Sequence, residues 1–223
     1  NGRCIIKMPI KLTHSNIQGL TKILNVNFMG NIDFSGTTFI NADFQGSVFS
    51  KFAGFEDVIF TGYASFANVR FIDDVSFADS QFTEGTLVRF DQAIFQKDAF
   101  FWGMGGKNTI FGGESTFRFA VFHGIAEFSN AVFRGKADFS FCRFFGEYIR
   151  LLNSHFGDEV SFMGSMVKGT ADFINNRFKN TSNFSYVSFN IADFSASNFE
   201  NHLSLTGAMF SRFNVQWNTI KDQ

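Results

Sequence analysis

The chain has 223 residues, of which 36 are Phe and one is Pro, and its 19 basic and 20 acidic residues give a formal net charge of −1. That length suits a single domain, and no ordinary globular protein is so rich in Phe. The balanced charge provides no field that would attract nucleic acid or anionic lipid, and two cysteines are too few for a disulfide framework or a four-ligand metal site.

We expect residues 1–11 to cap the N-terminal end of the repeat region, which covers residues 12–215. From Phe28 onward, Phe recurs mainly every five or six residues, for example from Phe28 to Phe82. Neither an α-helix, with its 3.6-residue period, nor a single strand, with its two-residue period, gives this spacing. It predicts a solenoid of short strands, four to a coil, with one central residue on each side pointing inward.

Numbering the sides from Phe28 on side one places every six-residue step between sides one and two or between sides three and four. The ten-residue step from Phe101 to Phe111 is the exception and predicts an inserted surface loop near residues 102–110. Residues 216–223 then form a second candidate cap, in which Trp217 and Ile220 serve either to cover the end or to contact a second chain.

The residue two positions before each central residue is small or β-branched almost throughout, so we assign it a second inward position. Cys142 occupies this position and is predicted to be a buried, inert thiol. The six-residue steps carry Gly, Asp or Asn two positions after the preceding central residue, and we expect positive φ there. These residues are Gly30, Gly62, Asp73, Gly113, Gly124, Gly135, Asp158, Gly169 and Asn180.

Four segments, 32–36, 41–46, 137–140 and 192–195, carry the pattern Ala or Ile, then Asp, Phe, and Ser or Gln. With these motifs the chain resembles the pentapeptide-repeat family, in particular a Phe-rich subgroup, over roughly residues 12–216. The resemblance implies an all-β fold, a right-handed quadrilateral parallel β-helix of about nine coils. At ~4.8 Å per coil, such a rod would be about 40 Å long.

No constellation of catalytic or metal-binding residues emerges from the sequence. The four histidines are far apart and occupy different repeat positions, and the glycine-rich stretch Gly103–Lys107 lacks the spacing and the hydroxyl residue of a phosphate-binding loop. We therefore expect a chain that is not an enzyme and that has no catalytic residue, cofactor or metal.

Three aromatic residues form the candidate interaction surface: Trp102, Phe119 and Phe141. Phe119 and Phe141 are 22 residues apart, one full coil, and both follow a side-four centre by two positions, so we expect them to stack outside the rod. Trp102 borders the inserted loop at the diagonally opposite corner. Exposed aromatic residues can mark a binding surface, but a stacked pair also stabilises a solenoid corner, and the sequence leaves both interpretations open.

The first functional hypothesis is a non-catalytic structural or protein-interaction scaffold, the soluble domain of a larger membrane-attached protein. Residues 10–19 and 213–221 are similar to segments that border Phe-rich repeats in secreted or membrane-attached microbial proteins, which favours an extracytoplasmic location over a cytoplasmic one. No run approaches the ~18 consecutive apolar residues of a membrane span. The expected partner is a protein, with no direct nucleic-acid binding, and a homodimer through the terminal caps is a further option.

The alternative hypothesis comes from the family resemblance and is a DNA-mimicking inhibitor of gyrase, a type II topoisomerase. Mimicry requires a strongly negative face. The acidic residues that precede central residues are divided between sides two and four, and Arg89 and Arg150 interrupt those columns.

Overall fold

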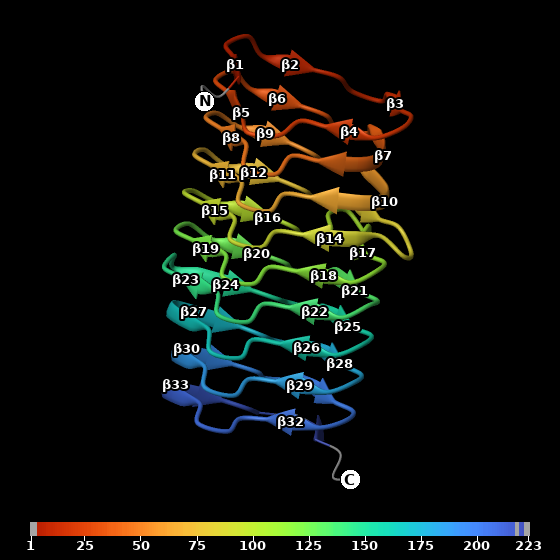
Figure 1. The fold of residues 1–223 in the computed structure, drawn as a ribbon. Helices are drawn as coiled ribbons and strands as arrows, with labels where there is room; N and C mark the ends of the chain where they lie inside the picture. The colour runs from red at the N-terminus through yellow and green to blue at the C-terminus, as the bar shows by residue number, and fades with distance from the viewer. Residues whose placement is uncertain (1–3, 217–218, 221–223) are drawn as a thin grey trace.

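The chain folds as an all-β solenoid of stacked parallel coils, and the computed structural model describes residues 4–216 and 219–220 of it. About ten coils follow one another from the red N-terminal coil to the blue C-terminal coil (Figure 1). No helix occurs in these residues. The four-sided parallel β-helix predicted from the Phe spacing is confirmed.

Sides one and two form one parallel sheet of 17 strands. Side one contains β1 (Cys4–Ile6), β5 (Val26–Phe28), β8 (Val48–Phe49), β11 (Arg70–Phe71), β15 (Ile94–Phe95), β19 (Val121–Phe122) and β23 (Arg143–Phe144). Side two contains β2 (Ile10–Lys11), β6 (Ile32–Asp33), β9 (Ala53–Gly54), β12 (Val75–Ser76), β16 (Ala99–Phe100), β20 (Ala126–Glu127) and β24 (Tyr148–Arg150). Three longer strands run across the corner between them: β27 (Met166–Asp172), β30 (Ser188–Asp193) and β33 (Met209–Asn214).

Sides three and four form the second parallel sheet. Side three contains β3 (Asn16–Ile17), β13 (Gln81–Phe82), β17 (Thr109–Phe111), β21 (Ala131–Phe133), β25 (His155–Phe156), β28 (Arg177–Phe178), β31 (Asn198–Phe199) and β34 (Thr219–Ile220). Side four contains β4 (Thr21–Lys22), β14 (Leu87–Arg89), β18 (Ser115–Thr116), β22 (Ala137–Asp138), β26 (Val160–Ser161), β29 (Ser182–Asn183) and β32 (Leu203–Ser204). Two strands cover both sides: β7 (Thr38–Asp43) and β10 (Ile59–Ser65).

The interior consists of columns of stacked rings, and 29 of the 36 Phe side chains are buried. Within one column, the ring of Phe77 lies 5.1 Å from that of Phe101 at an interplanar angle of 2°. The same ring meets Phe90 of the facing column edge-on, at 5.2 Å and 87°. Both geometries are favourable for aromatic rings, and each such pair adds ~0.5–1.5 kcal/mol beyond the burial of its apolar area.

Small polar side chains at the second inward position complete the backbone hydrogen bonding. The Ser165 hydroxyl donates to the carbonyl oxygen of Phe139 at 2.6 Å and accepts the backbone N–H of Cys142 at 2.9 Å. The Cys142 thiol donates in the same way to the carbonyl oxygen of Phe117, at 2.9 Å. Cys142 is fully buried, as predicted, and burial raises the pKa of its thiol.

The two cysteines should differ sharply in reactivity, because Cys4 is exposed and Cys142 is buried. Only the thiolate reacts with a disulfide reagent. In the native state the reagent cannot reach Cys142, and burial keeps its thiol protonated. In a titration with Ellman's reagent we expect one reactive thiol per native chain and a second one only after unfolding in guanidinium. Fast reaction of a native Cys4→Ser variant would contradict the buried placement of Cys142.

The prediction of positive φ at the six-residue steps is wrong for eight of the nine residues, since only Gly62 has a positive φ. The left-handed residues lie mainly at the five-residue corners, between sides two and three and between sides four and one. The glycines of the six-residue corners are needed for close approach instead: a Cβ atom on Gly30 would lie 2.5 Å from the Pro9 nitrogen, and one on Gly135 would lie 2.6 Å from the carbonyl carbon of Gly113. There the backbones of successive coils come too close for a side chain.

Gly135→Ala should therefore destabilise the fold by about 1–3 kcal/mol, because the new methyl group overlaps the coil beneath it. Gly157→Ala is the matched control, since its Cβ would find its nearest neighbour, the Arg134 carbonyl oxygen, at 3.3 Å. We expect the control to cost less than about 1 kcal/mol in the free energy of unfolding, measured by guanidinium denaturation. Equal effects of the two substitutions would contradict the close approach at Gly135.

The segments assigned as caps and as an inserted loop are placed as follows. Strands β1 and β2 lie within residues 1–11 and pair in parallel with β5 and β6, and residues 101–108 connect β16 to β17 without regular structure. Apolar residues of this first coil, including Ile6 and Ile17, are only partly buried. Trp217 and the side chain of Ile220 lie outside the described residues.

Candidate functional site

The corner between sides four and one has a left-handed residue in every described coil. We call these residues the corner column: Asn25, Gly46, Asn68, Gln92, Phe119, Phe141, Gly164, Tyr186 and Gly207. Gly and Asn adopt positive φ readily, whereas a bulky side chain pays about 1–2 kcal/mol for it. Three aromatic residues in this column therefore occupy a conformation that opposes their residue type.

Phe119, Phe141 and Tyr186, the aromatic ridge, are also exposed, with 50%, 37% and 64% of their surfaces accessible. The rings of Phe119 and Phe141 stack at 5.1 Å and 9°, which confirms the stacking predicted from their spacing. The Phe141 ring covers Gly164, because a Cβ atom there would lie 2.7 Å from its ring carbons. Sequence reasoning missed Tyr186, although it occupies the same register two positions after the central residue Phe184.

Open hollows lie on both sides of Phe119. On side one, a hollow of about 590 Å³ includes Arg70, Ile94 and Phe119, and one of about 390 Å³ includes Phe119, Phe141 and Arg143. On side four, a hollow of about 380 Å³ reaches from Leu87 to Asp138. The ridge thus separates two faces that a partner could contact together.

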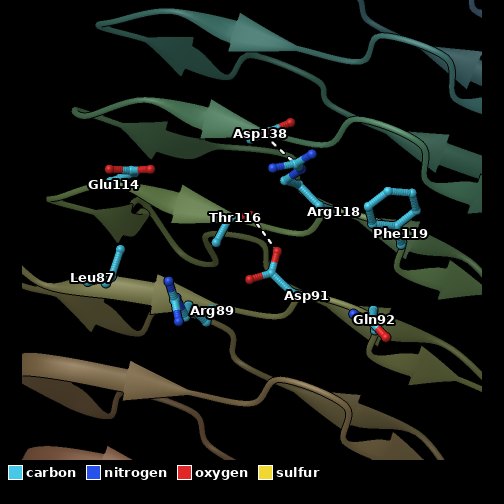
Figure 2. A pocket seen from close by; sticks show the side chains of 9 residues that line it. All are labelled: Leu87, Arg89, Asp91, Gln92, Glu114, Thr116, Arg118, Phe119 and Asp138. Atoms are coloured by element: carbon cyan, nitrogen blue, oxygen red, sulfur yellow. Dashed lines mark hydrogen bonds and ion pairs between the residues drawn. The ribbon is translucent and has the colours of Figure 1, made fainter.

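The side-four hollow is polar, and one ion pair crosses it. Figure 2 shows Arg118 beside the Phe119 ring, directed toward Asp138, with Nε 3.6 Å from the carboxylate oxygen. The Thr116 hydroxyl donates to the Asp91 carboxylate at 2.5 Å. Arg118 also lies 5.7 Å from the centre of the Phe119 ring, a cation–π contact that supports the ring from the side-four face.

Trp102 does not join the ridge. It follows β16 at the corner between sides two and three, is half-buried, and its ring lies 6.1 Å from that of Phe100. Its carbonyl oxygen accepts the Thr109 hydroxyl at 2.8 Å, which ties the inserted segment back to the rod. The interaction role predicted for Trp102 stays a prediction at a separate place on the molecule.

Acidic residues on side two are arranged around one arginine. Arg150 lies in register between Glu127 and Asp172, with nitrogen–oxygen distances of 3.6 and 3.9 Å to their carboxylates. Burial raises the pKa of Asp172, and this outweighs the attraction of Arg150, while Asp193 and Glu127 raise it further. Negative charge on this face is therefore partly neutralised rather than displayed.

Asp172→Asn should stabilise the protein at neutral pH. Because the folded-state pKa of Asp172 lies above its unfolded value, its protonated form favours folding, and that contribution is lost as the pH rises through the folded-state pKa. The variant should have a higher Tm than the wild type at pH 7 and the same Tm at about pH 3, below the unfolded pKa of ~3.9. A lower Tm at pH 7 would show that the contact with Arg150 dominates.

A search for known family patterns agrees with this architecture. The family model described as pentapeptide repeats (9 copies) matches residues 23–70, 55–105 and 128–175, more than half of the chain. The chain belongs to the pentapeptide-repeat family. The segment 106–127, which carries Phe119, lies between the matched ranges of this pentapeptide-repeat protein. None of the curated proteins matches it.

Two further findings concern the described residues of this pentapeptide-repeat protein. Over residues 4–216 and 219–220, no three His, Cys, Asp or Glu side chains are grouped so that they could hold a metal ion. In the same part of the chain, no helix has the length and apolar character needed to cross a membrane.

Proposed function

We propose that this pentapeptide-repeat protein is a non-catalytic scaffold that binds a protein partner through the aromatic ridge and the hollows beside it. The observation that carries the proposal is the conformation of the ridge. At the same corner five of the six other described coils use Gly or Asn, which turn at little cost, and the sixth uses Gln92, whereas Phe119, Phe141 and Tyr186 are strained and exposed. Strain without burial is typical of residues kept for contact with another molecule.

A purely structural role explains the ridge less well. Stacking of Phe119 on Phe141 adds about 0.5–1.5 kcal/mol, which is comparable to the cost of a single left-handed aromatic residue. Tyr186 has a glycine next to it in the following coil, Gly207, and its ring remains the most exposed of the three. Fold stability alone therefore gives little reason to place aromatic residues here.

The scaffold interpretation also agrees with the fold, since β-solenoids of this family generally have no catalytic role. Gyrase inhibition by DNA mimicry is less well supported, because Arg150 pairs with two carboxylates of side two and Arg118 pairs with one carboxylate of side four. Attachment to a membrane through a longer protein, an extracytoplasmic location and a dimer through the terminal caps stay predictions.

Replacing both ridge phenylalanines should weaken partner binding without unfolding the rod. A photo-reactive benzoylphenylalanine at position 119 would identify the partner in cells that make the protein, and the purified partner would then be titrated against each variant. We expect Phe119→Ala/Phe141→Ala to bind it about tenfold more weakly or worse, as for aromatic hot spots. Phe52→Ala, at an exposed position on another corner, should bind normally.

Equal affinities of the double variant and the Phe52→Ala control would overturn the proposal, provided that circular dichroism shows both to be folded. The alternative function is measured in the same preparations. Inhibition of gyrase supercoiling by the wild-type chain at micromolar concentration would favour DNA mimicry instead.

A further inference from the structure

The outward surface of side one carries no acidic side chain over its described length. We call the outward residues that directly precede the side-one centres the face-one column, and successive members pair in register: Ile5, Asn27, Val48, Arg70, Ile94, Val121, Arg143, Met166, Ser188 and Met209. None is Asp or Glu, although the chain contains 20 acidic residues. The adjacent corner column has none either.

Two arginines on this face form no ion pair within the described residues, as is also true of other exposed cations such as Arg134 and Lys179. Arg70 and Arg143 are exposed, and within residues 4–216 neither has a carboxylate at ion-pair distance. Arg118 and Arg150, on sides four and two, are paired with carboxylates of neighbouring coils. The cations of side one are therefore available to an anion from outside the chain.

The space between these arginines is apolar. Ile94 and Val121 separate Arg70 from Arg143 in the register, so three coil steps, about 14 Å at ~4.8 Å per coil, lie between the two cations. Phe119 stands beside this stretch and lines the hollows that contain each arginine. No acidic residue lines either hollow.

We propose that face one binds an extended acidic segment of a partner protein. Two carboxylates of the segment contact Arg70 and Arg143, and an apolar side chain between them packs on Ile94 and Val121 against the Phe119 ring. In an extended strand, side chains four residues apart point the same way and lie ~13 Å apart, close to the spacing of the arginines. The proposal rests on the proposed function and names the chemistry of its partner.

Other occupants fit these observations less well. Nucleic acid would favour a continuous row of cations along its phosphates, whereas here two apolar residues interrupt the pair. In a second copy of the chain, Glu127 and Asp172 of side two are already contacted by Arg150, and binding through other carboxylates of the chain would be detected as self-association. A free acidic segment satisfies both the charge and the apolar contact.

The test uses the fluorescein-labelled peptide Ser-Gly-Glu-Ser-Phe-Ser-Glu-Gly-Ser and the same peptide with both Glu replaced by Gln. Binding to the full chain is followed by fluorescence anisotropy at low salt. We expect the Glu peptide to bind with a Kd of about 1 mM or tighter and the Gln peptide about tenfold more weakly or worse. Arg70→Gln/Arg143→Gln should reduce binding of the Glu peptide by a similar factor.

The matched control is Arg134→Gln/Lys179→Gln, which removes two exposed positive charges next to side three and should change the affinity less than about twofold. Absence of binding, equal binding of the two peptides, or equal losses in the two double variants would overturn the proposal. Duplex DNA that binds more tightly than the Glu peptide, and whose binding Arg70→Gln/Arg143→Gln abolishes, would also overturn it. Self-association in sedimentation that the same variant abolishes would do so too.

Failure here can be separated from failure of the proposed function. A photo-cross-linked partner that needs Phe119 and Phe141 but binds Arg70→Gln/Arg143→Gln normally would leave the scaffold role intact and disprove only the acidic segment. Loss of affinity in the arginine variant alone would support face one and disprove the role of the ridge.

Discussion

The structure depends on one coincidence of distances. Parallel backbone hydrogen bonds place successive coils ~4.8 Å apart, and aromatic rings stack at nearly the same separation. A Phe that points inward from one coil therefore lies at stacking distance from the Phe of the next coil. The stacks along sides two and three, such as Phe101 on Phe128 at 4.8 Å and Phe111 on Phe133 at 4.5 Å, show how closely the two distances agree.

The same spacing determines what the corners can be. At some turns without a left-handed residue, such as Gly135, stacked coils approach so closely that a side chain would overlap the neighbouring coil, whereas Asp73, Asp158 and Asn180 occupy the same position elsewhere. Where a left-handed residue makes the turn, its side chain points outward and is free of the core, so its identity is not fixed by packing. This freedom allows Phe119, Phe141 and Tyr186 to form a ridge, although each left-handed aromatic residue costs about 1–2 kcal/mol. The stacked core determines the coil spacing, and the side chains of the corner column are available to contact a partner.

Much of the fold could be predicted from the sequence, because each coil repeats the same few inward positions. The columns, the burial of Cys142 and the stacking of Phe119 on Phe141 all follow from counting residues. Counting could not show which residue of a corner turns left-handed, and so positive φ was assigned to Gly30 and Gly135, which the close approach of two backbones explains instead. The same count of residues places Tyr186 at the corner of Phe119 and Phe141, because it follows the central residue Phe184 by two positions.

The electrostatic character of the faces was harder to predict. A net charge of −1 hides the separation between side one, which lacks carboxylates, and side two, where Arg150 lies between Glu127 and Asp172. Register alone places these residues next to one another, but the raised pKa of Asp172 depends on how deeply its carboxyl is buried. Trp102 lies at the corner opposite the ridge, where the count of residues places it.

The most direct test of the account is solvent paramagnetic relaxation in the NMR spectrum of a chain with isotope-labelled Phe. A soluble nitroxide should relax the ring protons of Phe119 and Phe141 strongly and leave those of Phe77, Phe101 and Phe128 almost unaffected, with ring-to-ring Overhauser effects linking Phe101 to Phe128. Strong relaxation of the latter rings, or the absence of contact between Phe101 and Phe128, would contradict the stacked core on which everything else rests.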